Sequence, residues 1–355
     1  MKIIRGEKAQ IDFGCDFVVQ FQENKKIKLL QLTDMQIIDA EQRRTPDRLR
    51  LDEIVAWAPD TIDQNFGNHV KSLVAQAKPD MIFITGDMVY GSFDDSGKTF
   101  EWFCEFMDSF AIPWTCVFGN HDNESYKGVD WQCQMLENTK YGLFKHGNVS
   151  GNGNFSVGIC VGEQLIRVFH MLDSHGCLCK EGIMPDQLAL VRENAKAIHK
   201  CQGKVVPAFI CMHFPVEEYS KAEAAKGYVG DCYTIGVDFV AKDNDFGTKM
   251  QNVKKMKPIQ VPGFSDVVKE CNIEAMFCGH FHSINTCIEH EGVKWVFGLK
   301  TGQYDYHNPG QIGGTLVTLE NENFSVSHLP SLAKYAPFPY GCNIFDDFFV
   351  KTEED

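Results

Sequence analysis

The sequence predicts a single-domain α/β protein built around a parallel β-sheet. Apolar runs rich in β-branched residues, each closed by a polar or glycine-containing cluster, indicate buried strands at 27–32, 81–84 and 114–118. Helix-like stretches lie between them at 68–78 and 98–110, where apolar residues recur three and four positions apart. Strands that alternate with helices are typical of a parallel sheet, because a parallel connection must cross over one face of the sheet.

The second half of the chain has a different pattern, with more hairpin-like runs. The expected elements are a hairpin at 153–161 and 164–172, a helix at 186–200, a strand at 205–211, a helix at 264–271, a strand at 274–277, three antiparallel-looking runs at 283–289, 292–297 and 314–319, and a last strand at 323–329. Two intervals, at about 39–67 and 215–257, are long for plain connections, and we expect loops that roof a site or short added helices there. The domain is expected to cover 1–345, followed by an acidic tail at 346–355.

Composition and charge exclude several classes of function. The chain has 355 residues, of which 44% are hydrophobic and 23% charged, as in an ordinary folded protein. Its net charge of −14 argues against a nucleic-acid partner, because such proteins neutralise phosphates with clustered Lys and Arg. A small phosphorylated substrate fits this charge better. The sequence says nothing about the oligomeric state.

The sequence also predicts a cytoplasmic protein with no membrane association. No apolar run approaches the roughly 18 residues that a membrane span needs, and charges stand where a secretory signal would be apolar. The fourteen cysteines include no CxxC pair, which favours buried, reduced thiols. Cys177 and Cys179, one residue apart, are expected to be ordinary loop thiols rather than zinc ligands.

The residues able to bind metal ions occur in five short motifs, and each motif follows the end of an expected strand. They are Asp34 and Gln36 in LTDMQ, Asp87 in TGDMVYG, Asn120, His121 and Asp122 in FGNHDNE, His213 in CMHFP, and His280 and His282 in CGHFH. Loops beyond the carboxyl ends of strands in an α/β sheet converge on one crevice. We therefore expect these side chains to meet in one pocket.

These residue types suit the hydrolysis of phosphate esters. Two cations about 3.5–4 Å apart neutralise the ester oxygens, which otherwise repel a nucleophile. Such a pair needs a bridging carboxylate, and Asp87, directly after Gly86, suits that position. Neutral imidazoles and amide oxygens complete the ligand shells without excess negative charge.

The series Asp-x-Gln, Gly-Asp-x-x-Tyr, Gly-Asn-His-Asp, an isolated His and Gly-His-x-His resembles the calcineurin-like metallophosphoesterase superfamily, including its purple acid phosphatase-like branch. The resemblance implies a four-layer αββα sandwich of two mixed sheets flanked by helices. It also implies two metal ions, manganese, iron or zinc, with a bridging hydroxide as nucleophile. The implied first-ion ligands are Asp34, Gln36, Asp87 and His282, and the implied second-ion ligands are Asp87, Asn120, His213 and His280. By the same resemblance, His121 protonates the leaving group, and Asp122 hydrogen-bonds behind it to orient its ring.

Two positions depart from the pattern of the superfamily. Gln36 stands where a histidine is usual, and a glutamine oxygen is a weaker, harder ligand that puts the first ion's affinity in doubt. Tyr90 stands where purple acid phosphatases carry a tyrosinate that binds ferric iron, although the first motif lacks the matching Asp-x-Gly form. Packing of Tyr90 over the site is the alternative.

Structural explanations remain open for several residues near these motifs. Taken alone, a single His213 is more often a core or loop histidine than a ligand. The neighbouring His170, Asp173 and His175 either reach the pocket or make local turn contacts, and Asn123 and Glu124 are expected to cap the following segment. A cluster of arginines either clamps substrate phosphate or is solvated: Arg43, Arg44, Arg48 and Arg50.

Three functions are compatible with these motifs. The first is a phosphoester hydrolase, acting on monoesters or small diesters. The second is a phosphate-ligand-binding protein that keeps the fold but has lost turnover because Gln36 replaces histidine. The third, a nuclease, is disfavoured by the acidic charge.

Overall fold

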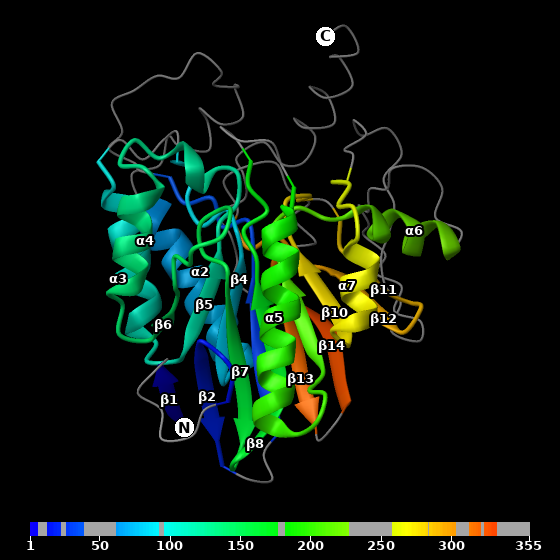
Figure 1. Cartoon of the computed structure of the whole chain (residues 1–355). Coiled ribbons are helices and arrows are strands. Elements are labelled where there is room, and N and C mark those ends of the chain that lie inside the picture. The colour runs from blue at the N-terminus through cyan, green and yellow to red at the C-terminus, as the bar shows by residue number, and fades with distance from the viewer. Residues whose placement is uncertain are drawn as a thin grey trace, which may run out of the picture.

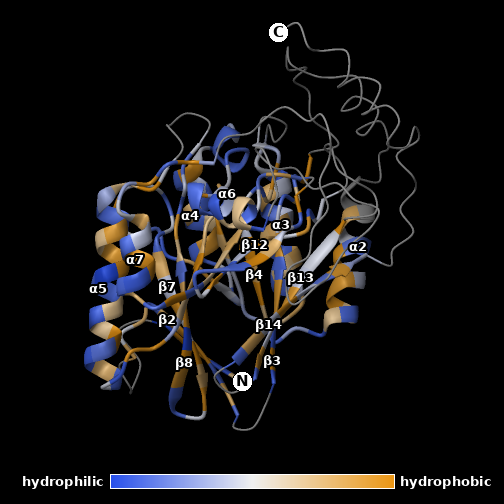
Figure 2. Ribbon diagram, turned by 90° about the vertical axis from the view of Figure 1, so that its right-hand side faces the viewer, coloured by the Kyte–Doolittle hydropathy of each residue, from blue (hydrophilic) through white to orange (hydrophobic). Residues whose placement is uncertain are grey.

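Two β-sheets packed face to face, with helices on both outer faces, form the protein. The structure is a computed structural model that describes residues 1–5, 13–22, 26–38, 62–91, 96–176, 182–226, 258–282, 284–302, 312–320 and 323–331. In Figure 2, helices α5 (Pro185–Gln202) and α7 (Phe264–Glu270) lie on one side of the strands, and α2 (Ile62–Ala77) lies on the opposite side. Helix α3 (Lys98–Ser109) follows α2 later in the chain. The expected four-layer αββα sandwich is therefore confirmed.

The six-stranded sheet contains the strands that precede the first three motifs. Its order is β14 (Asn323–Pro330), β13 (Gly313–Glu320), β3 (Ile27–Leu32), β4 (Met81–Thr85), β5 (Trp114–Val117) and β6 (Gly142–Leu143). Strands β3 to β6 are parallel, and β13 and β14 add an antiparallel edge. The central strands have continuous apolar runs because helices cover one face and the second sheet covers the other.

The eight-stranded sheet carries the strands that precede the last two motifs. Its order is β1 (Lys2–Arg5), β2 (Phe17–Phe21), β7 (Phe155–Val161), β8 (Gln164–Met171), β9 (Ala208–Cys211), β10 (Ile273–Cys278), β12 (Val293–Phe297) and β11 (Cys287–His290). Strands β7 and β8 form the expected hairpin, and β8, β9, β10 and β12 are parallel.

The three runs expected to be antiparallel do not form one antiparallel set. Strand β12 is parallel to β10 and antiparallel only to β11, and β13 belongs to the other sheet. Apolar periodicity shows which residues are buried but not which strand is the neighbour, so direction had no local signal here. Strands β1 and β2 at the N-terminus had no predicted counterpart.

The described residues also form the short helices α4 (Val129–Glu137) and α6 (Glu217–Ala225), both labelled in Figure 1, and the 3₁₀ helix η3 (Asp122–Glu124). Helix α6 is one of the short helices expected in the interval 215–257. Residues 39–61 and 227–257, with the arginine cluster, and the tail at 346–355 lie outside the described residues. No helix in the described ranges is both long and apolar enough to cross a membrane.

Most cysteine side chains in the described ranges are buried, as the sequence predicted. Cys177 and Cys179 lie outside those ranges.

Aromatic side chains between the two sheets hold them in register. The ring of Phe83 on β4 lies 5.4 Å from that of Phe169 on β8 and 5.2 Å from that of Phe277 on β10. All three rings are fully buried. Burial of one such side chain contributes about 1.5–3 kcal/mol to stability. These contacts fix the two sets of strand ends relative to each other, and the motifs extend from those ends.

Candidate metal centre

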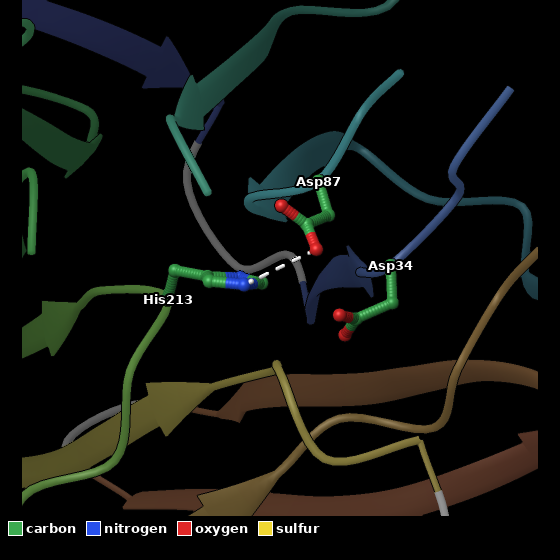
Figure 3. Close-up of side chains that lie close together, drawn as sticks. All are labelled: Asp34, Asp87 and His213. Carbon is green, nitrogen blue, oxygen red and sulfur yellow. Dashed lines mark ion pairs between the residues drawn. The ribbon is translucent and has the colours of Figure 1, made fainter. Parts of the chain in front are cut away.

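The structure brings the expected residues together at the carboxyl ends of strands from both sheets. Strands β3, β4 and β5 lead into the motifs at 34–36, 87 and 120–122, and strands β9 and β10 lead into the motifs at 213 and 280–282. Oxygen or nitrogen atoms of Asp34, Asp87 and His213 lie within 4.8 Å of one another, and all three residues are buried. In Figure 3 the three side chains point into one shared space from different parts of the chain.

Candidate donors for the second metal position lie around His213. Its Nε2 lies 3.1 Å from Asn120 Oδ1 and 3.4 Å from Asp87 Oδ2, and its Nδ1 lies 2.8 Å from the carbonyl oxygen of Thr85. With Nδ1–H donating to that carbonyl, Nε2 is the ring atom that faces the two oxygens. Donors that share an ion at about 2.0–2.2 Å lie roughly 3–3.5 Å apart. The His280 ring, 5.1 Å from that of His213, borders the same space, so these residues fit a cation.

The first metal position is only partly suited to an ion. His282 Nε2 lies 3.4 Å from Asp34 Oδ1, as two ligands of one ion would. Gln36, however, departs from its expected role as an oxygen ligand. Its Oε1 accepts a hydrogen bond from Lys300 Nζ, and its Nε2 points toward Asp87 Oδ2 at 3.5 Å. An amide nitrogen has no lone pair available for a metal ion, so the residues present do not complete this position.

Four residues of the motifs have strained backbone conformations. Asp34, Gln36, Asp87 and His280 have positive φ angles of 49°, 46°, 53° and 73°. A left-handed conformation costs a non-glycine residue roughly 1–2 kcal/mol. Such strain persists only where the surrounding structure enforces it, and it marks functional sites.

Glycines in the motifs allow the backbone to approach the carboxylates closely. A Cβ atom on Gly119 would lie 2.5 Å from the backbone nitrogen of Asp87 and 2.8 Å from its Cγ, and a Cβ on Gly279 would lie 2.5 Å from Asp34 Oδ2. The loops after these glycines hydrogen-bond to the same carboxylates. The His121 N–H donates to Asp87 Oδ1 at 2.8 Å, and the His280 N–H donates to Asp34 Oδ1 at 3.0 Å.

The two carboxylates are held ionised, whereas the histidines differ in charge. Burial opposes the charge on Asp34, but the adjacent His282 lowers its pKa to about 2. Burial likewise opposes charge on Asp87, but His213 and His121 lower its pKa further. Burial lowers the pKa of His213, yet the attraction of Asp87 outweighs it and raises that pKa to about 9. Burial and the nearby His213 keep the pKa of His280 well below its usual value.

His121 has a different partner from the one the sequence suggested. Its Nδ1 pairs with Glu124 Oε2 at 2.9 Å, whereas the oxygens of Asp122 accept backbone N–H groups of Val89 and Gly119 at 3.0 and 2.8 Å. The expectation that Asp122 orients the His121 ring is therefore wrong, and Asp122 instead shapes the loop. Burial and the charge of Asp87 raise the pKa of Asp122 to about 7. The one-turn helix η3 turns the chain so that Glu124 contacts the His121 ring. The i,i+3 spacing of the two residues was the sequence signal for this contact.

Other residues noted in the sequence have local explanations. The Tyr90 ring stacks on the His121 ring with centroids 4.0 Å apart, which matches the packing alternative. His175 Nδ1 pairs with the carbonyl of Gly182, and Asp173 accepts the backbone N–H groups of His175 and Asn152, as turn residues do. Asn123 donates to the Gly119 carbonyl.

Comparison with known proteins places this geometry in a family. Residues 27–283 match the profile of the calcineurin-like phosphoesterases. "Probable inactive purple acid phosphatase 14" of Arabidopsis thaliana is 23% identical over 335 residues, which are 86% of this chain and 77% of that protein. "Phosphatase DCR2" of Saccharomyces cerevisiae is 24% identical and covers 78% of this chain, which spans 47% of that protein. A dimetal phosphatase from Danio rerio has a TM-score of 0.48 at 11% identity, over 86% of this chain and 98% of its own. The chain belongs to the calcineurin-like phosphoesterase family.

Proposed function

We propose that the protein is a metal-dependent hydrolase of small phosphorylated substrates, either monoesters or small diesters. The observation that carries this proposal is the junction at Asp87. One of its oxygens accepts the His121 backbone N–H, and the other faces His213 at 3.4 Å. The Asp87 carboxylate therefore contacts both a proposed metal ligand, His213, and the backbone of the proposed general acid, His121.

Asp87, Asn120, His213 and His280 would hold an ion at the second position. A bound cation supplies Lewis-acid polarisation of a phosphoryl oxygen. Manganese, iron and zinc all suit this mixture of carboxylate, amide oxygen and imidazole. The expectation of two ions depends on the first position, where Gln36 faces Lys300.

His121 is the proposed general acid. Its Nδ1 is paired to Glu124, so Nε2 is the ring atom that we propose transfers a proton to a departing alkoxide, and the nearby carboxylate stabilises the charged ring. Tyr90, stacked on the other side, restricts rotation of the imidazole. A positioned acid of this kind contributes about 10²–10⁴-fold to a rate.

An assay with aryl phosphate monoesters and diesters tests this proposal, with Mn²⁺, Fe²⁺ or Zn²⁺ added in turn. We expect His121→Ala to lower kcat about 10²–10⁴-fold. The exposed His199 on α5 provides the matched control, so His199→Ala should retain wild-type turnover. Unchanged hydrolysis by His121→Ala would refute the assignment of His121 as the general acid.

A phosphate-ligand-binding protein without turnover is the second candidate. The Gln36–Lys300 contact favours it, and one relative has a name that begins "Probable inactive". Phosphate binding to the metal-loaded protein, with both ester types left intact under every metal, would select this function over the first.

A further inference from the structure

Lys300 determines which way the Gln36 amide faces. An ammonium group has only donors, so the amide atom against Lys300 Nζ must be the oxygen. This removes the ambiguity between oxygen and nitrogen that usually affects glutamine side chains. The amide nitrogen is then the atom 3.5 Å from Asp87 Oδ2. The only side-chain atom of Gln36 that can ligate a metal ion is thus turned toward a cation.

Lys300 is itself built into the base of the site. It is 2% exposed, and its Nζ donates to the Asp34 carbonyl oxygen at 3.0 Å. The two residues after it pair with the end of strand β3, because the N–H of Thr301 donates to Thr33 O and the N–H of Gly302 donates to Asp34 O. A buried ammonium that lost these partners would carry a large desolvation cost. The contact with Gln36 is therefore a fixed part of the fold.

The charge of Lys300 also acts against an ion at the first position. Asp34 and Asp87 are the two carboxylates expected to serve that ion, and an ammonium already lies against the residues at 34 and 36. An ammonium and two divalent ions in one buried space would repel one another strongly. The contacts of Lys300 are with the residues at 34 and 36, whereas the second position is centred on His213, which contacts Thr85, Asn120 and Asp87.

We propose that Lys300 closes the first metal position: it holds Gln36 with its nitrogen toward Asp87, and its ammonium replaces the first ion, so that one divalent ion binds, at the second position. His282 then pairs with Asp34 rather than with an ion. The inference rests on the proposed metal dependence of the site. It assigns to Lys300, which lies outside all five motifs, control over how many ions the chain holds.

Metal stoichiometry tests the proposal directly on the full-length protein. Titration with Mn²⁺ in a calorimeter, with elemental analysis after dialysis, should give one ion per chain for the wild type. The double variant Lys300→Met with Gln36→His removes the ammonium and supplies an imidazole. We expect it to bind a second ion at least tenfold more tightly than the wild type does.

Lys294→Met is the matched control, since Lys294 is also a buried lysine but pairs with Glu289 on the neighbouring strand. It should leave the count at one. Two ions bound with similar affinity by the wild type would overturn this inference while leaving the proposed hydrolase intact. A wild type that binds no Mn²⁺ would overturn both. The wild-type count decides the matter even if the double variant does not fold.

Discussion

Gly119 is the position where one methyl group should disturb the site most selectively. Its backbone φ is not in the left-handed region, so alanine is allowed there as far as the backbone is concerned. The added Cβ would lie 2.5 Å from Asp87 N and 2.8 Å from Asp87 Cγ. Non-bonded atoms prefer separations of about 3.5–4.0 Å. The Asp87 carboxylate would therefore have to move by roughly 1 Å.

The displacement of Asp87 in Gly119→Ala should lower metal affinity more than it lowers stability. Overpacking of this kind costs about 1–3 kcal/mol in unfolding free energy. A shift of 1 Å in a functional group can reduce function by about 10²-fold. We expect the dissociation constant for Mn²⁺, measured by calorimetry, to rise at least tenfold, with a cooperative urea transition retained.

Gly67→Ala is the control for the methyl group itself. Gly67 lies in α2, and a Cβ there would meet Phe106 at an ordinary 3.4 Å. This variant should bind Mn²⁺ as the wild type does. If Gly119→Ala did the same, the assignment of Asp87 as a ligand whose position depends on the close approach of Gly119 would be refuted.

Two further predictions concern other side chains. Glu124→Gln removes the charge beside His121 Nδ1 and should lower kcat about ten- to hundredfold with little change in KM. Steady-state kinetics measure this loss, and an equal loss of kcat in Asn123→Ala would contradict a specific role of Glu124. Burial lowers the pKa of His170 to about 4, so below pH 6.5 the unfolded chain takes up a proton that the folded protein refuses, and stability falls as the pH drops. Between pH 7.5 and 5 this costs about 2 kcal/mol. His170→Leu should lose that much less stability in urea titrations over the same range, and an equal loss in both proteins would exclude the effect.

The sequence was sufficient to predict the strands that carry the motifs and the convergence of their donors. Both depend on local signals: a buried apolar run, and polar residues directly after it. The six-stranded sheet shows this well, since β3 has the predicted bounds and β4 and β5 differ by one residue. The N-terminal strands β1 and β2 and the direction of β12 depend on pairing between distant segments, for which the local sequence carries no comparable pattern.

The partners of the site residues were harder to predict than the residues themselves. Glu124 was expected to cap a following segment, because its i,i+3 spacing from His121 becomes a contact only where the chain turns as a 3₁₀ helix. Lys300 lies 264 residues from Gln36, and their contact requires the segment after β12 to pair with the end of β3.

The motifs hold one another in place, and this explains why each is weak evidence alone. Asp87 from the second motif is held by the backbone of the third, through the His121 N–H, and Asp34 from the first is held by the backbone of the fifth, through the His280 N–H. His213 from the fourth pairs with the Thr85 carbonyl beside the second. A carboxylate reaches its strained conformation only when a loop from another strand supplies its hydrogen bond. The centre therefore forms as one unit with the packing of the two sheets, and the order of the motifs along the chain is informative because the topology of the sheets requires it.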